Sequence, residues 1–587
     1  MQARGRIATS WMAFIVTSLI LTWAVAPQPA MAEQVWLSGW FHVIWADPYP
    51  GSHVDAVQTF AIIDDDGQWT SIALDEALIS PFAGARALNR RRVKIVGERM
   101  SAPHGWDSSS AYQAIQAHSI EFEGPGAAGA AAAEASPLAV AGSQLWVTIL
   151  CRFADSTEVT PHDASWFTTL MGSARPGMDH YWKELSYENI NLTGSVVVGW
   201  YNLPQPKSYY VDSNETKLDS LLNDCTAAAD ADVFFPNYSG INLMFNQDLD
   251  CCAWGGSSTL IRDGQTKFYS VTWMPVWGYQ TQSVLGHEMG HGFGLPHSSG
   301  DYGQTYDNAW DVMSDDRINC SLSSDPVYGC LGQHTIAYHK DYLGWIPAGQ
   351  KYVATPGSSA TITLEQLALP QTNNYKMAQI PIGASTTHFY TVEVRRRVGY
   401  DVKLPGDAVI IHEVDTTRSR PAHVLDVDNN GDTGDAGAMW IPGETFVDSA
   451  NGITVSVNAA TATGFEVTIS YSPPGTCDPA QVGTNQLVGC LYDNTTLAGS
   501  PQTTAPAGPT LASPVPSSAT ALAIDWGGGG PFGTASDTYS IRWKGTFTFA
   551  AGTYLFTVGA DDGVRLKIDG TTWIDDWSDH GYRETSQ

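Results

Sequence analysis

The sequence predicts a multidomain protein in which one α/β domain is flanked by all-β domains. Three observations carry this prediction. The chain has 587 residues, more than one hydrophobic core usually organises. Only 15% of the residues are charged and 21 are tryptophans, a composition typical of folded, β-rich domains rather than disorder. Helix-like and strand-like patterns occur together only in residues 143–346, whereas the segments on either side show strand-like runs.

Residues 1–32 have the features of a secretory signal peptide. Arg4 and Arg6 precede an apolar run over 11–25, and Ala30-Met31-Ala32 offers a small-residue cleavage site. The run is short for a membrane span, and no later segment is long and apolar enough to be one. We therefore expect a secreted protein, extracellular or associated with a cell wall, without a membrane span.

The charge balance narrows the classes of partner. The formal net charge is −30 at pH 7, and both basic residues of the signal peptide leave with it. Such a surface repels nucleic acid and anionic membranes, so neither is an expected partner. An acidic surface also suits calcium binding, although a solvated carboxylate without a ligand is the commoner case.

Eight cysteines follow the signal peptide, and an even count in an exported chain predicts up to four disulfides. Sequence proximity favours the pairs Cys320 with Cys330 and Cys477 with Cys490. The other four cysteines allow three pairings, which the sequence leaves open: Cys151, Cys225, Cys251 and Cys252.

The first domain, residues 33–123, is expected to be a small β-barrel or sandwich. Its strand-like runs are 35–45, 60–63, 92–96 and 119–122. It is either a propeptide or a stable accessory domain. An Ala/Gly-rich linker follows over 124–142, where proteolysis could release the domain.

Residues 143–346 show an alternation of strands and helices. Expected core strands are 145–151, 195–200 and 241–245, and expected helices lie within 166–185 and 281–293.

The most informative segment is H-E-M-G-H-G-F-G-L-P-H, residues 287–297. In a helix, His287 and His291 stand one turn apart on one face and can share a metal ion. Glu288 lies beside them, where a general base can meet a water. Gly294 can take the left-handed conformation that ends the helix, so that His297 returns as a third ligand. Three protein ligands with an open fourth position are typical of catalytic Zn²⁺.

This string resembles the extended zinc motif of the metzincin peptidases. The later segment W-D-V-M-S, residues 310–314, resembles their methionine turn, so Met313 is expected beneath the metal. A-W-D-V-M-S and a looser match at 338–345 resemble the gametolysin-like branch and related secreted bacterial peptidases. The resemblance implies an α/β metzincin-like catalytic domain, Zn²⁺ as cofactor, Glu288 as general base, and protein or peptide substrates.

Two features of the resemblance leave questions open. Asp315 stands where some metzincins have a tyrosine, so no group besides zinc is identified that would stabilise the oxyanion. The first domain contains no cysteine, so the cysteine latch of some metzincin proforms is not available. Metzincins also place an edge strand beside the cleft. Residues 253–258 are the candidate for that strand, and a plain turn is the equal alternative.

Residues 347–474 are expected to form a β-sandwich-like domain, with strands at 361–364, 389–394, 408–414 and 465–471. Within it, oxygen-bearing side chains alternate as in the first half of a calcium loop. The candidate Ca²⁺ ligands are Asp426, Asp428, Asn430, Asp432 and Asp435. Gly437 occupies the twelfth position, where an intact loop has glutamate, so a solvated acidic turn is the alternative.

Residues 484–587 contain W-G-G-G-G at 526–530, Y-S-I-R-W at 539–543, and a Gly-Asp-rich segment at 559–570. These resemble the β-sandwich module first described in anthrax protective antigen. In its sugar-binding members paired aspartates hold a calcium ion that also ligates sugar hydroxyls. Asp561 and Asp562 stand at the matching place, which makes glycans and Ca²⁺ expected ligands; a hairpin turn is the structural alternative. Because strands of the module are missing at Gln587, we expect the chain to be truncated.

Together these features predict a secreted zinc endopeptidase that acts on extracellular or cell-wall proteins. The alternative is a glycan-binding adhesin or cell-wall protein with a vestigial peptidase domain, against which the intact Glu288 argues. A glycosidase is a third reading, but the chain offers no defensible pair of catalytic carboxylates.

Overall fold

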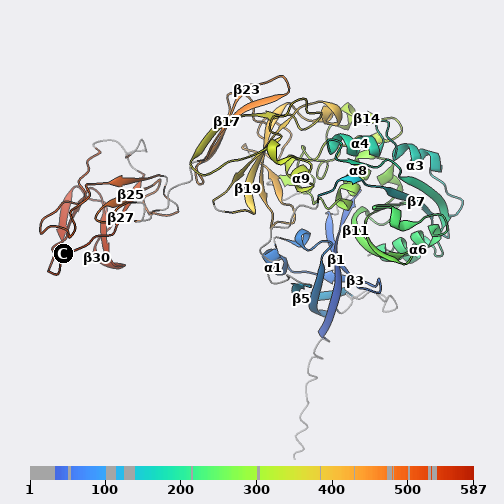
Figure 1. Ribbon diagram of the computed structural model, residues 1–587, viewed down its shortest axis with the longest axis horizontal. Helices are drawn as coiled ribbons and strands as arrows, with labels where there is room; N and C mark the ends of the chain where they lie inside the picture. The colour runs from blue at the N-terminus through green and yellow to red at the C-terminus, as the bar shows by residue number, and fades with distance from the viewer. Residues whose placement is uncertain are drawn as a thin grey trace, which may run out of the picture.

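The computed structural model describes residues 34–587 apart from 50–54, 83, 101–113, 124–138, 213–215, 301–304, 384, 429, 472–476, 478, 480–481, 500, 502, 527–530 and 532–537. The predicted signal peptide, most of the predicted linker and the glycines after Trp526 therefore lie outside the described residues. The protein is multidomain and rich in β-sheet (Figure 1). No helix among the described residues is long and apolar enough to cross a membrane.

The first domain is a closed five-stranded β-barrel. Its strands pair in the order β2-β3-β5-β4-β1, and β1 also pairs with β2, which closes the ring. Alternate residues fill the interior, among them Phe41, Val43 and Val93. Of the barrel and sandwich that the sequence left open, the barrel is the observed form. Its strands are β1 Gln34–Pro48, β2 Val57–Ile63, β3 Trp69–Ala73, β4 Arg92–Arg99 and β5 Ala114–Phe122.

Strand β1 is longer than the barrel needs. Its last five residues, Ile44 to Pro48, pair antiparallel with β11 of the next domain. The barrel and that domain therefore share one continuous ten-stranded sheet. Figure 1 shows β1 rising from the barrel to β11.

The second domain contains the rest of that sheet, in the order β11-β12-β10-β7-β9. β12, β10, β7 and β9 run parallel, and β11 is antiparallel to β12. Trp146 and Leu150 pack on the side of α4 and α8, and Val147 and Ile149 on the side of α6. The strands are β7 Trp146–Arg152, β9 Val196–Asn202, β10 Gly240–Phe245, β11 Cys252–Arg262 and β12 Gln265–Met274.

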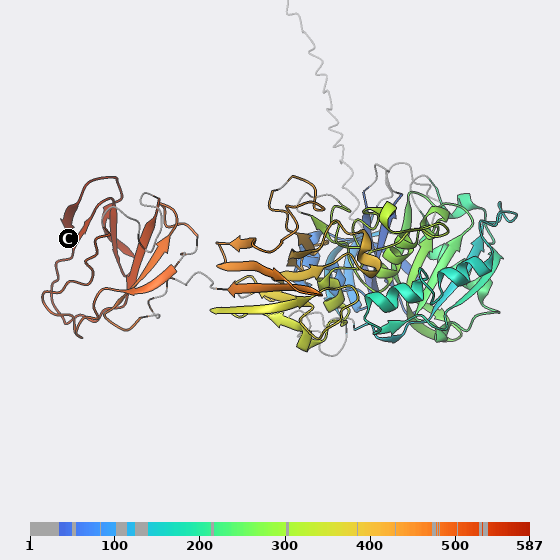
Figure 2. The same cartoon turned by 90° about the horizontal axis from the view of Figure 1, so that it is seen from above.

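The helices of this part of the chain cover both faces of the sheet (Figures 1 and 2). They are α3 Ala164–Leu170, α4 Met178–Leu185, α5 Lys207–Tyr210, α6 Leu218–Ala229, α7 Val276–Tyr279, α8 Gln282–Gly292 and α9 Ala337–Tyr342. The helix expected within 166–185 is present as α4. It is separate from α3, because the chain turns so tightly at Gly177 that a Cβ there would lie 2.2 Å from the Gly172 carbonyl oxygen.

The third domain is a pair of packed sheets. One has the order β13-β21-β20-β19-β18-β16 and the other β17-β24-β23-β22. Val392, Ile411 and Val467 contribute to the core that the two sheets share. The strands are β13 Ser299–Gly300, β16 Lys351–Val353, β17 Ser358–Glu365, β18 Met377–Pro381, β19 His388–Arg395, β20 Ala408–Asp415, β21 Ala422–Val424, β22 Thr445–Asp448, β23 Ile453–Ala460 and β24 Gly464–Tyr471. Because β13 follows His297 directly and pairs with β21, this domain holds the loop beside the histidines.

The last domain lies apart from the others in both views (Figures 1 and 2). Its strands form three small sheets, β26-β25-β27, β28-β31 and β29-β30. Their bounds are β25 Leu487–Tyr492, β26 Thr503–Ala507, β27 Ser540–Gly545, β28 Thr557–Ala560, β29 Val564–Ile568, β30 Thr571–Asp576 and β31 Arg583–Ser586.

All eight cysteines form disulfides. The two expected local pairs, Cys320–Cys330 and Cys477–Cys490, are present. The pairing that the sequence left open is Cys151–Cys225 and Cys251–Cys252. The first of these joins β7 to α6, and the second lies where β11 begins.

Candidate metal centre

Helix α8 carries the first two histidines through the centre of the second domain. Every residue of this helix is buried, so its position is fixed by packing on all sides. Its glycines permit that packing: a Cβ on Gly290 would lie 2.4 Å from the sulfur of Met313. The helix ends at Gly294, whose φ is +97°, and the chain then turns back through Pro296. His297 thereby reaches the face that His287 and His291 present.

The three imidazoles converge on one point. The Nε2 atoms of His287 and His291 are 3.1 Å apart, and those of His287 and His297 are 3.2 Å apart. The third separation, His291 to His297, is 3.1 Å. Around tetrahedral zinc with Zn–N bonds of about 2.1 Å, neighbouring nitrogens stand roughly 3.4 Å apart. The three rings therefore need only a slight opening to hold the ion.

Backbone carbonyls fix which ring nitrogens face inward. Nδ1 of His287 lies 2.7 Å from the Val312 carbonyl oxygen, and Nδ1 of His291 lies 2.7 Å from that of Leu295. Each Nδ1 must donate to its carbonyl, so each Nε2 presents a lone pair to its neighbours. The lone pairs of these two converging Nε2 atoms repel each other unless a cation lies between them. The donor set thus fits a metal of the zinc type, held by neutral imidazoles.

Glu288 lies beside this triangle and is fully buried. Neither of its carboxyl oxygens has a hydrogen-bond partner among the described residues. Burial and the charge of Asp47 raise the pKa of Glu288 well above its usual value. This carboxyl group therefore holds a proton more tightly than an exposed one and can exchange it with a group that lies next to it.

The predicted methionine turn lies below the histidines. Met313 is fully buried, with its sulfur against Gly290 of α8. Asp311 holds the turn: its carboxylate accepts hydrogen bonds from the Ser298 hydroxyl at 2.7 Å and from the Met313 backbone N–H at 3.1 Å. Burial opposes ionisation, but His339 and these donors outweigh it and hold the pKa of Asp311 below its usual value. Asp311 therefore stays charged and ties the turn to the loop after His297.

Two residues of the site were missed by the sequence analysis. Asp47, near the end of β1, places Oδ1 at 2.7 Å from Nε2 of His297 and Oδ2 at 3.2 Å from Nε2 of His291. Tyr306 donates its hydroxyl to Asp47 Oδ1 at 2.5 Å, with its ring against His297. No motif marks either residue. Asp47 joins the three histidines only through the fold, which brings one ligand atom of each of the four residues within 4.8 Å of one another.

The electrostatics of this cluster favour a cation at its centre. Burial alone would raise the pKa of Asp47, but the three histidines outweigh it and hold it well below the usual value. Burial lowers the pKa of His291 to about 3 and also lowers that of His297. At His287 the Asp47 carboxylate overcomes burial and raises the pKa to about 8. Burial and Asp47 raise the pKa of Tyr306 well above its usual value, so its phenol keeps its proton and donates.

Strand β11 passes close to the carboxyl group of Glu288. A Cβ on Gly255 would lie 2.5 Å from the Glu288 carbonyl oxygen and 2.7 Å from Oε2 of the same residue. Only glycine permits this approach. The segment 253–258 is therefore a strand rather than a turn, but it is not a free edge, because β1 pairs with it.

Of the predicted calcium ligands, three carboxylates gather: Asp426, Asp428 and Asp435. Asn430 lies against this group, because its amide donates to Asp428 at 3.1 Å and to Asp435 at 2.6 Å. Asp432 lies outside it and accepts from the Gly434 backbone N–H. The glycine at the twelfth position also has a structural reason, because a Cβ on Gly437 would lie 2.2 Å from Oδ1 of Asp426.

Asp561 and Asp562 are exposed between β28 and β29. Asp562 accepts a hydrogen bond from the His580 backbone N–H at 3.3 Å. Among the described residues, Asp561 and Asp562 do not form a group of three metal-ligating side chains.

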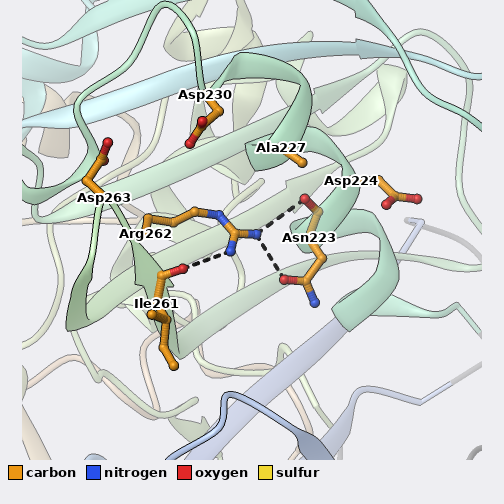
Figure 3. A pocket seen from close by; sticks show the side chains of 7 residues that line it. All are labelled: Asn223, Asp224, Ala227, Asp230, Ile261, Arg262 and Asp263. Carbon is orange, nitrogen blue, oxygen red and sulfur yellow. Dashed lines mark hydrogen bonds between the residues drawn. The ribbon is translucent and has the colours of Figure 1, made fainter.

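A cavity of about 460 Å³ lies between α6 and the far end of the β11–β12 hairpin. Figure 3 shows Arg262 lying across it and donating to Asn223, at 3.0 Å from its side-chain oxygen. Gly255 stands seven residues earlier on β11, roughly 20 Å away along an extended strand. This cavity is therefore separate from the histidines.

The fold and the site define a multidomain chain with a three-histidine metal centre in its second domain. Comparison with known proteins adds a family for the last domain: residues 484–587 match the PA14 domain. A curated relative, anti-sigma-I factor RsgI3 of Acetivibrio thermocellus, is 43% identical over 66 residues, which is 11% of this chain and 10% of that protein. The chain therefore spans only a tenth of the relative's length. Neither match reaches most of the chain, so the function of the second domain is argued from its own residues.

Proposed function

We propose that the protein is a secreted zinc-dependent endopeptidase that hydrolyses extracellular or cell-wall proteins. The observation that carries the proposal is the convergence of three Nε2 atoms within 3.2 Å of one another, beside a buried carboxyl group whose oxygens have no hydrogen-bond partner among the described residues. A metal held by His287, His291 and His297 would supply Lewis acidity to the scissile carbonyl and lower the pKa of a water to about 7.

The remaining chemistry belongs to residues of this chain. Glu288 takes the proton from the attacking water and returns it to the leaving amine, because its buried carboxyl group lies beside the three histidines and its oxygens have no hydrogen-bond partner among the described residues. Asp315 stands where some metzincins have a tyrosine, so that position provides no hydrogen-bond donor for the oxyanion. Tyr306 provides the donor instead. Its hydroxyl already donates to an oxygen beside the three histidines, so it can donate to the oxyanion that develops there.

Strand β11 would position the substrate. An extended peptide that pairs with Gly255 and Gly256 lies directly over Glu288, because Gly255 lets the strand approach the helix. The backbone hydrogen bonds of such pairing are independent of side chains. This is consistent with action on polypeptides in general.

The test compares zinc content and hydrolysis of a diverse peptide library in four forms of the protein. These are the native chain, Glu288→Gln, Asp47→Asn and the double variant; Asp47→Asn is included because this carboxylate lies against the histidines. We expect all four forms to bind one zinc per chain. We expect the double variant to hydrolyse peptides at least about 100-fold more slowly than Asp47→Asn alone. Equal hydrolysis by Asp47→Asn and the double variant, or none by any zinc-loaded form, would refute the proposal.

A second activity, glycan binding by residues 484–587, is favoured by the PA14 match. It would direct the peptidase to a glycan-bearing surface. Binding of the full chain to a glycan array, lost when Asp561 and Asp562 are both changed to Asn, is the expected result.

A further inference from the structure

We propose that Asp47 is a fourth metal ligand and that β1 holds the centre in a latent state by occupying the position of a substrate strand. This inference rests on the proposed function, since it concerns the same metal and the same cleft. It assigns an inhibitory role to the first domain. The sequence did not decide whether this domain is a propeptide or an accessory domain.

The position of the carboxylate is the first argument. Oδ1 of Asp47 lies 2.7 Å from His297 Nε2 and 3.6 Å from His287 Nε2, while Oδ2 lies 3.2 Å from His291 Nε2. The group therefore caps the triangle of nitrogens. Three neutral imidazoles and one carboxylate complete a tetrahedral zinc site. A complete ligand set leaves no position for water or substrate, which a catalytic site requires.

The backbone of β1 is the second argument, because it blocks the cleft independently of the metal. Trp45 pairs with Gly255 and Ala46 with Trp254, next to the strand position that lies over Glu288. The pairing continues past Asp47, where the Tyr49 N–H donates to the Cys251 carbonyl oxygen at 2.9 Å. A peptide substrate cannot add to β11 while β1 occupies it.

Side chains on the inner face of β1 fix its register. Trp45 and Asp47 are two residues apart and so point to the same face of the strand. The Trp45 ring stacks on the His291 ring at 4.5 Å between centroids, with 7° between the planes. Asp47 is only 6% exposed, and Tyr306 holds its Oδ1 by a hydrogen bond. A slip of one residue would turn both side chains away from the histidines.

The barrel anchors the strand from outside the cleft. Arg90 donates to the Gly292 carbonyl oxygen at 2.5 Å, at the end of α8. His42 lies 2.9 Å from the hydroxyls of both Ser257 and Thr259, on β11. Together with Asp47 and Trp45, these contacts hold β1 against β11, so replacing Asp47 weakens this hold and lets a peptide compete with β1 for β11. Latency is thus a property of the intact chain.

The experiment uses the full chain loaded with Co²⁺, whose visible absorption reports its coordination, and acetohydroxamate as a probe of an open coordination position. Asp47→Asn is the test variant, since the amide keeps the shape of the carboxylate but ligates the metal poorly. Asp66→Asn, an exposed change in a turn of the same barrel, is the matched control. Asp47→Ala is a second test variant in case the amide retains a contact.

We expect the native chain and Asp66→Asn to bind one Co²⁺ and to show no spectral change with acetohydroxamate. Both Asp47 variants should bind Co²⁺ about 10-fold or more weakly, change their spectrum with acetohydroxamate, and hydrolyse peptides at least about 10-fold faster than the native chain. Native protein that binds acetohydroxamate as well as the Asp47 variants do would overturn the inference.

The outcomes separate this inference from the proposed function. An Asp47 variant that opens to acetohydroxamate but hydrolyses no peptide supports the fourth ligand and refutes the peptidase. A native chain that hydrolyses peptides as fast as Asp47→Asn supports the peptidase and refutes latency. Failure of every form to bind the metal refutes both.

Discussion

Oδ1 of Asp47 and Nε2 of His297 lie 2.7 Å apart although 250 residues separate them in the chain. The contact joins the β-barrel to the metal centre. It exists because β1 is long enough to leave the barrel and pair with β11, which runs over the helix of the first two histidines. The barrel and the second domain therefore both contribute residues to the cluster, and variants of either one should change the metal binding that we propose.

The histidine ligands are tested by metal content. His291→Ala should lower zinc affinity by more than about 100-fold, because it removes one of three nitrogens that converge on the ion. His118→Ala, an exposed histidine on β5, is the control and should keep one zinc per chain. Equilibrium dialysis against zinc measures both. One tightly bound zinc in His291→Ala would show that the ion is held elsewhere.

Tyr306→Phe tests the oxyanion donor. In the Asp47→Asn background it should lower kcat by about 10- to 1000-fold while KM and zinc content change little, since the hydroxyl acts on charge that develops in the transition state. Steady-state kinetics on one peptide provide both constants. A rise in KM at constant kcat would instead assign Tyr306 to substrate binding.

Asp311→Ala should destabilise the second domain. The change leaves the buried His339 ring, the Ser298 hydroxyl and the Met313 N–H without their acceptor. Breaking such a buried network costs about 3–5 kcal/mol, or a fall of roughly 10 °C in the midpoint of a domain of this size. Calorimetry of the full chain resolves the transition. An unchanged midpoint would mean that the turn is held by packing alone.

Asp315 should make stability depend on pH. Burial and the neighbouring Asp316 raise its pKa in the folded protein to about 6, whereas in the unfolded chain it is about 3.9. Between these values the folded state holds a proton that the unfolded state has lost, so stability falls as pH rises from about 4 to 6. Asp315→Asn should remove this penalty.

The gain from Asp315→Asn should be on the order of 2 kcal/mol above pH 6 and vanish below pH 4. Denaturant midpoints of the native chain and the variant at pH 4, 5, 6 and 7 measure it. A gain that is equal at pH 4 and pH 7 would contradict the assigned pKa.

Calcium should bind at the loop of the third domain through the three gathered carboxylates. Asp435→Asn should weaken binding about 10-fold or more, because it removes a charged ligand. Asp432→Asn is the matched control, as Asp432 caps the Gly434 N–H outside the group. Calorimetric titration with Ca²⁺ distinguishes them. Equal loss in both variants would restore the larger ligand set that the sequence suggested.

Local features were predictable because they depend on neighbouring residues. The helix of the first two histidines was expected at 281–293 and is observed as Gln282–Gly292. Gly294 ends it with positive φ, and the disulfides Cys320–Cys330 and Cys477–Cys490 are those expected from proximity. The helix expected within 166–185 is observed as Met178–Leu185, and the compact turn at Gly177 sets where it begins. The resemblance of residues 484–587 to the module first described in anthrax protective antigen is also confirmed, because these residues match the PA14 domain.

By itself, the sequence determined the three histidines, Glu288 and Met313, because an i, i+4 pair on a helix and a glycine-ended turn bring ligands together over eleven residues. Only the tertiary structure decided what faces them. Asp47 and Tyr306 reach the site through strand pairing and through a loop held by another domain, and such long-range contacts have no period or spacing in the chain. The same pairing turned the expected free edge at 253–258 into a covered strand, because hydrogen-bonding groups of β11 were satisfied by β1.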